Sequence, residues 1–251
     1  MFVAASTECF ADLPLDAALQ RLVDLEYNRV EITLLERSQQ LKPSQVHADL
    51  DSAVSVCRET HRLTPVAYYV DIDAEGDLYY EQFSACCKLA KATKVVTLTV
   101  RSGEIGTPFN AEIERLRELV RIGSLDGVQI GLKTETGRMS QDPATAIVMC
   151  DNVKGLGITL DPSHFVCGPH KSGNYDQIFK YVIHLQLRDT TKDKLQVRVG
   201  QGEVEYGRLV TQLGKFRYNR ALCVNILEQP ESGVDHMAEM RKMRLLLESL
   251  L

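Results

Sequence analysis

Short apolar runs alternate with amphipathic stretches from one end of the chain to the other. Runs typical of buried strands fall at residues 2–5, 29–33, 64–70, 94–100, 127–134, 156–160, 182–188 and 221–226. Between them, apolar residues recur at helical spacing, as in Leu15, Ala18, Leu19 and Leu22. This spacing predicts helices from residue 14, at 43–61, 78–91 and 110–122, from residue 143, and at 175–181, 206–215 and 236–251. The pattern therefore predicts eight strands that alternate with eight helices.

Strict alternation of strands and helices indicates parallel strands joined by right-handed crossovers. Eight such units close into a (β/α)8 TIM barrel, and the competing arrangement is an open, doubly wound sheet. No GxGxxG follows the first strand, which makes a dinucleotide-binding sheet a poor match. The length of 251 residues matches the roughly 250 that are typical of one such barrel. We therefore predict an α/β protein whose residues 1–251 form a single barrel domain.

Composition narrows the class of protein and its partners. The formal net charge is −5 and no long basic cluster is present, which argues against a nucleic-acid partner. No apolar run approaches the roughly 18 residues of a membrane span, and the N-terminus does not resemble a signal peptide. The seven cysteines are odd in number and form no CxxC pair, which is typical of free thiols in a reducing compartment. We expect a cytoplasmic protein without membrane contact, and its association into a homo-oligomer stays open.

Polar residues follow nearly every predicted strand, where barrel enzymes carry their active sites. After the sixth strand come Asp161 and His164, which are competent as metal ligands or as an acid/base pair. The alternative is that Asp161 only caps the next segment. In the seventh strand His184, Gln186 and Arg188 alternate with leucines and so share the inward face. They indicate either a ligand site or an internal layer of salt bridges and hydrogen bonds.

Four segments resemble one group of proteins, the xylose isomerase-like barrels, which include sugar-phosphate isomerases and epimerases and the endonuclease IV type of DNA repair enzyme. The segments are Gly131-Leu132-Lys133-Thr134-Glu135-Thr136-Gly137, Leu160-Asp161-Pro162-Ser163-His164, His184-Leu185-Gln186-Leu187-Arg188-Asp189 and Val199-Gly200-Gln201-Gly202-Glu203-Val204-Glu205-Tyr206. Their order along the chain, together with the eightfold alternation, extends the resemblance over nearly the whole sequence.

The resemblance implies a divalent metal at the barrel mouth, held by Glu135, Asp161 and the residues at two further positions. Where the family has a histidine in the seventh strand this chain has Gln186, and where it has a glutamate after the eighth it has Asn225. Neutral amides bind divalent metals weakly, through oxygen, so Mg or Mn suits this set better than Zn. Whether a metal binds at all is left open by these two changes.

The resemblance further implies a sugar, sugar-phosphate or sugar-acid isomerase or epimerase, with Glu135 and His164 as catalytic residues. Arg188, Lys133, His184 and Glu228 are the predicted substrate-binding residues. Arg188 and Lys133 suit a carboxylate or phosphate, and Glu228 and Glu203 are the two acids that could fill the gap left at position 225. For Arg188 the alternative interpretation is an ion pair with Asp161 or Glu135. For Glu228 it is a solvated loop side chain. A sugar-binding barrel that has lost its metal is the second hypothesis. Cleavage of abasic DNA is a distant third, since the strand ends offer too few histidines.

Overall fold

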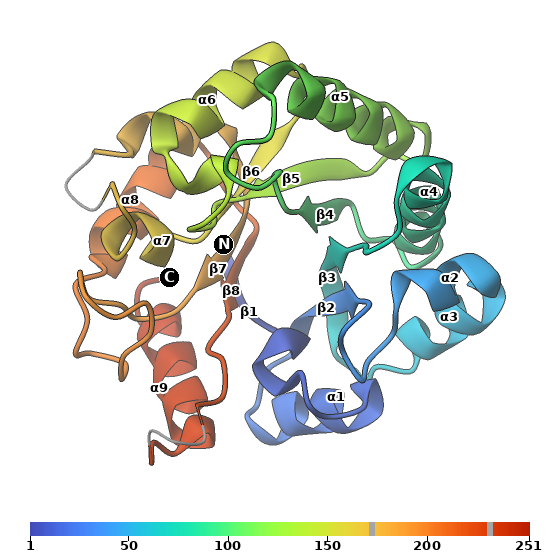
Figure 1. Cartoon of the computed structure of the whole chain (residues 1–251). Coiled ribbons are helices and arrows are strands. Elements are labelled where there is room, and N and C mark those ends of the chain that lie inside the picture. Colours follow the sequence, from blue (N-terminus) through green and yellow to red (C-terminus); the bar gives the residue numbers. More distant parts are fainter. Residues whose placement is uncertain (171–173, 230–232) are drawn as a thin grey trace.

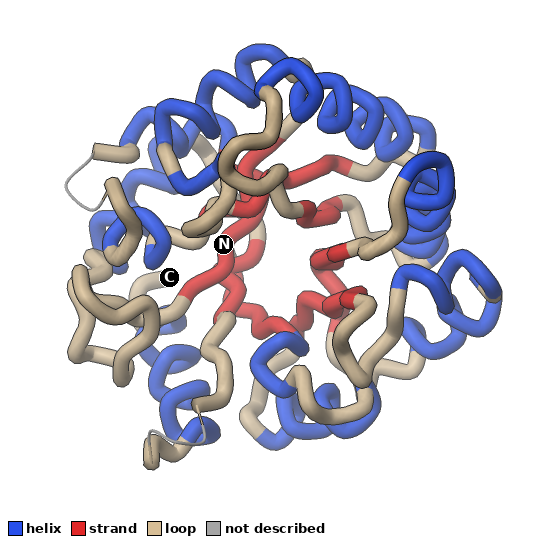
Figure 2. Tube along the Cα trace, viewed as in Figure 1, coloured by secondary structure: helices blue, strands red, loops and turns tan. Residues whose placement is uncertain are grey.

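The computed structural model describes residues 1–170, 174–229 and 233–251, and within these ranges parallel strands close into a barrel in sequence order, β1 to β8 (Figures 1 and 2). The strands are β1 (Phe2–Ser6), β2 (Arg29–Leu35), β3 (Thr64–Asp71), β4 (Thr97–Val100), β5 (Gln129–Lys133), β6 (Gly157–Leu160), β7 (Val182–Leu187) and β8 (Ala221–Val224). β8 pairs with β1 to close the ring. The predicted (β/α)8 barrel is confirmed.

Helices surround the ring of strands on its outer side (Figure 2). The α-helices are α1 (Leu15–Asp24), α2 (Pro43–Ala48), α3 (Leu50–Arg58), α4 (Gly76–Ala92), α5 (Phe109–Leu125), α6 (Pro143–Asn152), α7 (Ser163–Val166), α8 (Tyr206–Lys215) and α9 (His236–Glu248). Short 3-10 helices are η1 (Thr7–Phe10), η2 (Met139–Gln141) and η3 (Asp176–Tyr181). In the described part of the chain, no helix is both long and apolar enough to span a bilayer.

Two predicted helices differ from the structure. The helix expected at 43–61 is two helices, because Asp49 adopts φ −148° and ψ 88° and its carboxylate accepts a hydrogen bond from the Ser52 amide. An aspartate that bonds this way starts a new helix instead of continuing the previous one. The segment expected to be helical at 175–181 forms the 3-10 helix η3.

Alternation along the strands separates two apolar regions. Leu222 and Val224 of β8 pack in the large core between the strands and the surrounding helices. Ala221 and Cys223, which point the other way, form a small cluster with Ala4 inside the ring. Small side chains on these adjacent strands leave room in the interior for longer polar side chains from neighbouring strands. The inward and outward faces predicted for the eighth strand are therefore confirmed.

All seven cysteines lie among the described residues and are free thiols, and all but Cys167 are buried. Burial raises the pKa of the Cys57 thiol to about 11 and that of Cys9 to about 12, so both stay protonated and unreactive at neutral pH.

Candidate active site at the barrel mouth

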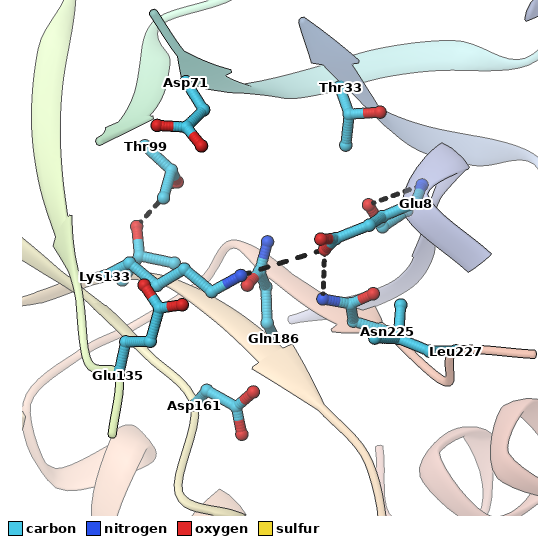
Figure 3. Close-up of polar contacts among 12 residues, drawn as sticks. Glu8, Thr33, Asp71, Thr99, Lys133, Glu135, Asp161, Gln186, Asn225 and Leu227 are labelled. Carbon is cyan, nitrogen blue, oxygen red and sulfur yellow. Dashed lines mark hydrogen bonds and ion pairs between the residues drawn. The ribbon is translucent and has the colours of Figure 1, made fainter. Parts of the chain in front are cut away.

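The carboxyl ends of the strands bring a dense group of charged and amide side chains together at the mouth of the barrel (Figure 3). Lys133 ends β5, Glu135 and Asp161 lie just past β5 and β6, and Asn225 follows β8. Gln186 lies near the end of β7, directly before Leu187. Further members are Glu8 from η1, Asp71 from β3, Arg101 after β4 and Arg188 after β7.

Glu135 is held by a bidentate ion pair. The Arg101 guanidinium donates to its two carboxylate oxygens over 2.8 and 2.7 Å, and also to Asp71 Oδ2 over 2.9 Å. Burial raises the pKa of Glu135, but Arg101 and then Lys133 outweigh that effect and hold the pKa below its usual value. Glu135 is thus ionised at neutral pH, the state that a general base requires.

Asp161 is fully buried and faces a cation. Arg188 places a guanidinium nitrogen 3.1 Å from Asp161 Oδ2, and the Ser163 hydroxyl and amide donate to Oδ1. Burial raises the pKa of Asp161, but the charge on Arg188 and the other donors lower it overall. The ion pair that was one of two interpretations of Arg188 is therefore present in the structure, with Asp161 as its partner.

His164 is a neutral donor in this arrangement. Burial, with the nearby Arg188 and Lys133 charges, lowers its pKa against the opposing effect of Asp161. The Thr136 amide donates to Nδ1 over 3.1 Å, so the proton is on Nε2, which lies 3.7 Å from Asp161 Oδ2. Because Nδ1 already accepts a hydrogen bond, His164 can offer an N–H to a ligand more readily than it can remove a proton.

Lys133 lies in the middle of the group and points toward Glu8 (Figure 3). Its ammonium is 3.8 Å from Glu8 Oε2 and 4.2 Å from the centre of the Tyr69 ring. Burial lowers the pKa of Lys133, but the combined effect of Glu8, Tyr69 and Glu135 more than offsets this, so that the pKa is raised and the ammonium stays charged. A buried cation that is held by a distant ion pair and an aromatic face retains N–H groups for a ligand.

Below the mouth, three side chains join β7 to β2 across the barrel interior. Glu31 accepts from His184 Nε2 over 2.7 Å and from Gln186 Nε2 over 2.8 Å. The intervening strands allow this contact because they carry the small residues Cys223 and Ser6 at this level. His184 is therefore hydrogen-bonded to Glu31 at the deeper level. Its side chain is 2% exposed, the smallest exposed fraction among the predicted substrate-binding residues.

The two neutral amides have fixed orientations. Gln186 Nε2 donates to Glu31 over 2.8 Å, and Asn225 Nδ2 donates to Glu8 Oε2 over 2.8 Å. Each amide oxygen then points away from its carboxylate. Within the described residues, Gln186 Oε1 and Asn225 Oδ1 are buried and accept no hydrogen bond, whereas Asp161 Oδ2 forms the ion pair with Arg188. Arg188 Nε is likewise a buried donor without an acceptor there.

These contacts allow a test of the predicted metal ligands Glu135, Asp161, Gln186 and Asn225. Gln186 and Asn225 each carry a buried oxygen that accepts no hydrogen bond among the described residues, as ligands would. Arg101 already neutralises Glu135, however, and Arg188 neutralises Asp161. A divalent ion would also be repelled by the buried ammonium of Lys133, and two of its ligands would be uncharged. In this arrangement the four residues do not fit a divalent ion.

A second group of potential ligands lies deeper. Among the described residues, Glu31, His184 and Cys223 bring ligand atoms within 4.8 Å of one another, and all three are buried. Both Glu31 oxygens already accept strong hydrogen bonds. Burial also raises the pKa of the Cys223 thiol well above its ordinary value. A metal would have to displace these donors and deprotonate the thiol, so hydrogen bonding explains this group without one.

The loop after β7 is built around Asp189. Its Oδ2 accepts from the Gly200 and Gly202 amides over 2.8 and 3.0 Å. A Cβ on Gly202 would lie 1.9 Å from Asp189 Oδ1, so this close approach requires glycine. The segment 199–206 that carries part of the resemblance therefore shapes the loop beside the mouth.

The structure brings together most of the predicted site residues. Glu135, Asp161, His164, Lys133, Arg188, Gln186 and Asn225 all belong to the mouth, with His184 one layer below. Glu228 does not join them: it is exposed and lines a separate hollow with Arg21 and His236. Beside the mouth, a cavity of about 410 Å³ is lined by Arg101, Arg115 and Arg138, among others.

Sequence reasoning did not single out Glu8, Glu31, Asp71 and Arg101 as site residues, although three of them were visible as polar residues at strand ends. Their roles depend on pairing across the barrel, which joins residues 30 to 217 positions apart in the sequence. The one available signal was that Glu8, Asp71 and Arg101 follow predicted strands and that Glu31 lies within one.

Comparison with known proteins agrees with the fold. No family model and no curated protein matches the sequence. Among solved structures, a D-tagatose 3-epimerase-like protein aligns over 100% of this chain and 98% of its own, with a TM-score of 0.76 and 16% identity. A xylose isomerase-like TIM barrel protein from Mycobacterium smegmatis in complex with magnesium gives 0.75 and 16%, over 99% and 97%. The IolI protein with a bound zinc atom gives 0.73 and 15%, over 100% and 99%. The chain thus has the fold of the xylose isomerase-like TIM barrels.

Proposed function

We propose that this chain belongs to the xylose isomerase-like group and is an isomerase or epimerase of a small sugar, sugar phosphate or sugar acid. The observation that carries the proposal is a set of buried polar atoms at the mouth that have no hydrogen-bond partner among the described residues: the amide oxygens of Gln186 and Asn225 and the Arg188 Nε donor. Buried polar atoms need partners, and hydroxyl groups both donate and accept hydrogen bonds. A polyhydroxylated ligand satisfies the whole set.

The proposed chemistry is proton transfer at the carbon next to a carbonyl. Glu135, ionised and 17% exposed, takes the proton. The electron pair of the broken C–H bond passes into the carbonyl, and the resulting enediolate oxygen is stabilised by the charges of Lys133 and Arg188. His164 donates from Nε2 to a substrate oxygen. Cations of the protein thus supply the electrostatic stabilisation at this site.

The adjoining space has a size that suits a small sugar, and arginines as well as the acids Asp71 and Glu75 line it. The cavity of about 410 Å³ lies against Arg101, the partner of Glu135, and two further arginines line it. Guanidinium groups match carboxylates and phosphates. The free thiols fit a reducing environment, and we include a cytoplasmic location in the proposal.

A sugar-binding barrel without catalytic activity is the second candidate. It is favoured by the bidentate Arg101 contact, which occupies both Glu135 oxygens, and by the amides at 186 and 225. Cleavage of abasic DNA finds no support in a mouth that carries several carboxylates.

Deuterium incorporation separates these candidates. The protein is incubated in D2O with a panel of aldoses, ketoses, sugar acids and their phosphates, and NMR follows both interconversion and deuterium at carbon. We expect Glu135→Gln to abolish interconversion while the circular dichroism spectrum and melting temperature show a folded protein. An unchanged rate in this variant would refute the role of Glu135. Binding of a panel member without incorporation by the unaltered protein would support the binding barrel.

A further inference from the structure

We infer that Glu8 is a second proton-transferring carboxylate, which faces Glu135 across the mouth and makes the reaction an epimerisation. This inference rests on the proposed function and specifies its chemistry. Glu8 follows β1 and lies on η1, and Glu135 follows β5. In the closed order β1 to β8, these two strands are four positions apart and hence on opposite walls of the barrel.

Access from the mouth distinguishes Glu8 from the fully buried acids. The side chain of Glu8 is 18% exposed and that of Glu135 is 17% exposed, whereas Asp161 and Glu31 are fully buried. A substrate that enters the mouth can therefore reach Glu8 and Glu135 but not the carboxylates of Asp161 and Glu31 without displacing their protein partners.

The contacts of Glu8 hold its Oε2 atom in place and leave its Oε1 atom without a protein partner among the described residues. Asn225 Nδ2 donates to Oε2 over 2.8 Å, and the Lys133 ammonium lies 3.8 Å from the same oxygen. Among the described residues, no hydrogen bond or ion pair to Oε1 is present in the structure. The amide at position 225 thus serves as a positioning residue that orients Glu8, and Oε1 is the atom that exchanges a proton.

Lys133 lies between the two carboxylates, where charge develops during the reaction (Figure 3). Both Glu8 and Glu135 interact electrostatically with its ammonium. An enediolate bound between Glu8 and Glu135 therefore has its oxygen next to a cation, whichever carboxylate removed the proton.

The proposed step balances without a co-reactant. One carboxylate removes the proton from the carbon, the C–H electron pair moves into the carbonyl, and an enediolate forms. For the epimer whose hydrogen faces Glu135, Glu135 starts ionised and Glu8 starts with a proton on Oε1, which it gives to the other face of the same carbon as the electron pair returns. The reverse reaction starts from the exchanged pair, with the proton on Glu135 and Glu8 ionised. The configuration is inverted, no oxidation occurs, and proton exchange with water resets the pair.

If two opposed carboxylates exchange the proton, Glu8→Gln and Glu135→Gln should differ in their pattern of deuterium exchange. Each variant is tested with both epimers of a substrate that the panel above has identified. Each variant should lose interconversion by roughly 10²-fold or more, the usual worth of an acid/base group. Glu8→Gln should still incorporate deuterium, without inversion, into the epimer whose hydrogen faces Glu135. Glu135→Gln should do so only with the other epimer.

Glu203→Gln is the matched control, because Glu203 is a loop carboxylate that is paired with Lys192 outside the mouth and should leave all rates unchanged. Interconversion by Glu8→Gln at the unaltered rate would overturn the role of Glu8 and leave the proposed function intact. Loss of exchange from the same epimer in both variants would also overturn it. If the unaltered protein exchanges no panel member, the proposed function fails and this inference fails with it.

Discussion

Glu31→Gln tests the hydrogen-bonded group that spans the barrel interior below the site. The substitution keeps the shape of the side chain and removes its charge. Glu31 is fully buried and accepts from His184 and Gln186, so the new amide turns one N–H toward a neighbouring donor. The perturbation therefore affects stability first and the orientation of Gln186 second.

The magnitude follows from the two contacts. Each hydrogen bond to a charged group contributes about 1.5–3 kcal/mol. A buried donor that loses its acceptor costs about 1–3 kcal/mol in addition. The glutamine keeps one acceptor oxygen and with it one of the two contacts, so we expect a loss of about 3 kcal/mol. The free energy of unfolding of a typical domain is about 5–15 kcal/mol, so this is a large fraction of it.

Urea unfolding as a function of pH measures this loss. Burial raises the pKa of Glu31, but His184 and Gln186 outweigh it and hold the pKa below its usual value. A lowered folded pKa means that the carboxylate stabilises the fold above the unfolded pKa of about 4.3 and ceases to do so as the pH falls through the folded pKa. The difference between the two proteins should be full at pH 7 and shrink on acidification below about pH 4.

The control is Glu118→Gln, which alters an ion pair with Arg121 on the outer surface of α5. This variant should unfold at nearly the same urea concentration as the unaltered protein, because solvent screens an exposed pair. The reasoning is refuted if the two variants lose equal stability, or if the loss in Glu31→Gln is independent of pH.

Three further predictions concern the loop, a helix start and metal dependence. Gly202→Ala should destabilise the protein by about 1–3 kcal/mol in urea unfolding, because its Cβ meets Asp189, whereas Gly207→Ala in α8 meets no atom within 4 Å and should not destabilise it. Asp49→Ala removes the cap of α3 and should lower stability by about 1 kcal/mol, which would be contradicted by an unchanged unfolding midpoint. Dialysis against EDTA should leave the melting temperature unchanged; a drop that Cys223→Ser abolishes would instead locate a structural metal at Glu31, His184 and Cys223.

Much of the fold could be predicted because strand and helix periods are local properties of the sequence. The helix at 206–215 and the inward face of β8 follow directly from spacing. The break at Asp49 could not be predicted in the same way, because an aspartate inside an apolar pattern is equally compatible with a continuous helix. The cap becomes visible only once its bond to Ser52 is known.

The candidate site could be placed but its pairing could not be predicted. Strand ends located Glu135, Asp161 and Lys133, since barrel topology brings strand ends together. The partner of each carboxylate depends on side-chain reach across the ring. Sequence spacing does not show that Arg101 forms an ion pair with Glu135 while Arg188 forms one with Asp161.

The two amides that interrupt the resemblance are explained by their neighbours. Asn225 lies 2.8 Å from Glu8 Oε2, so a glutamate at position 225 would bring a second carboxylate against the first. Two carboxylates at such a distance cannot both ionise readily. Gln186 likewise donates from its amide to Glu31, which also accepts a hydrogen bond from His184. The acid at position 8 and the amide at position 225 are therefore complementary, and the Lys133 ammonium lies 3.8 Å from the same Glu8 oxygen that accepts from Asn225.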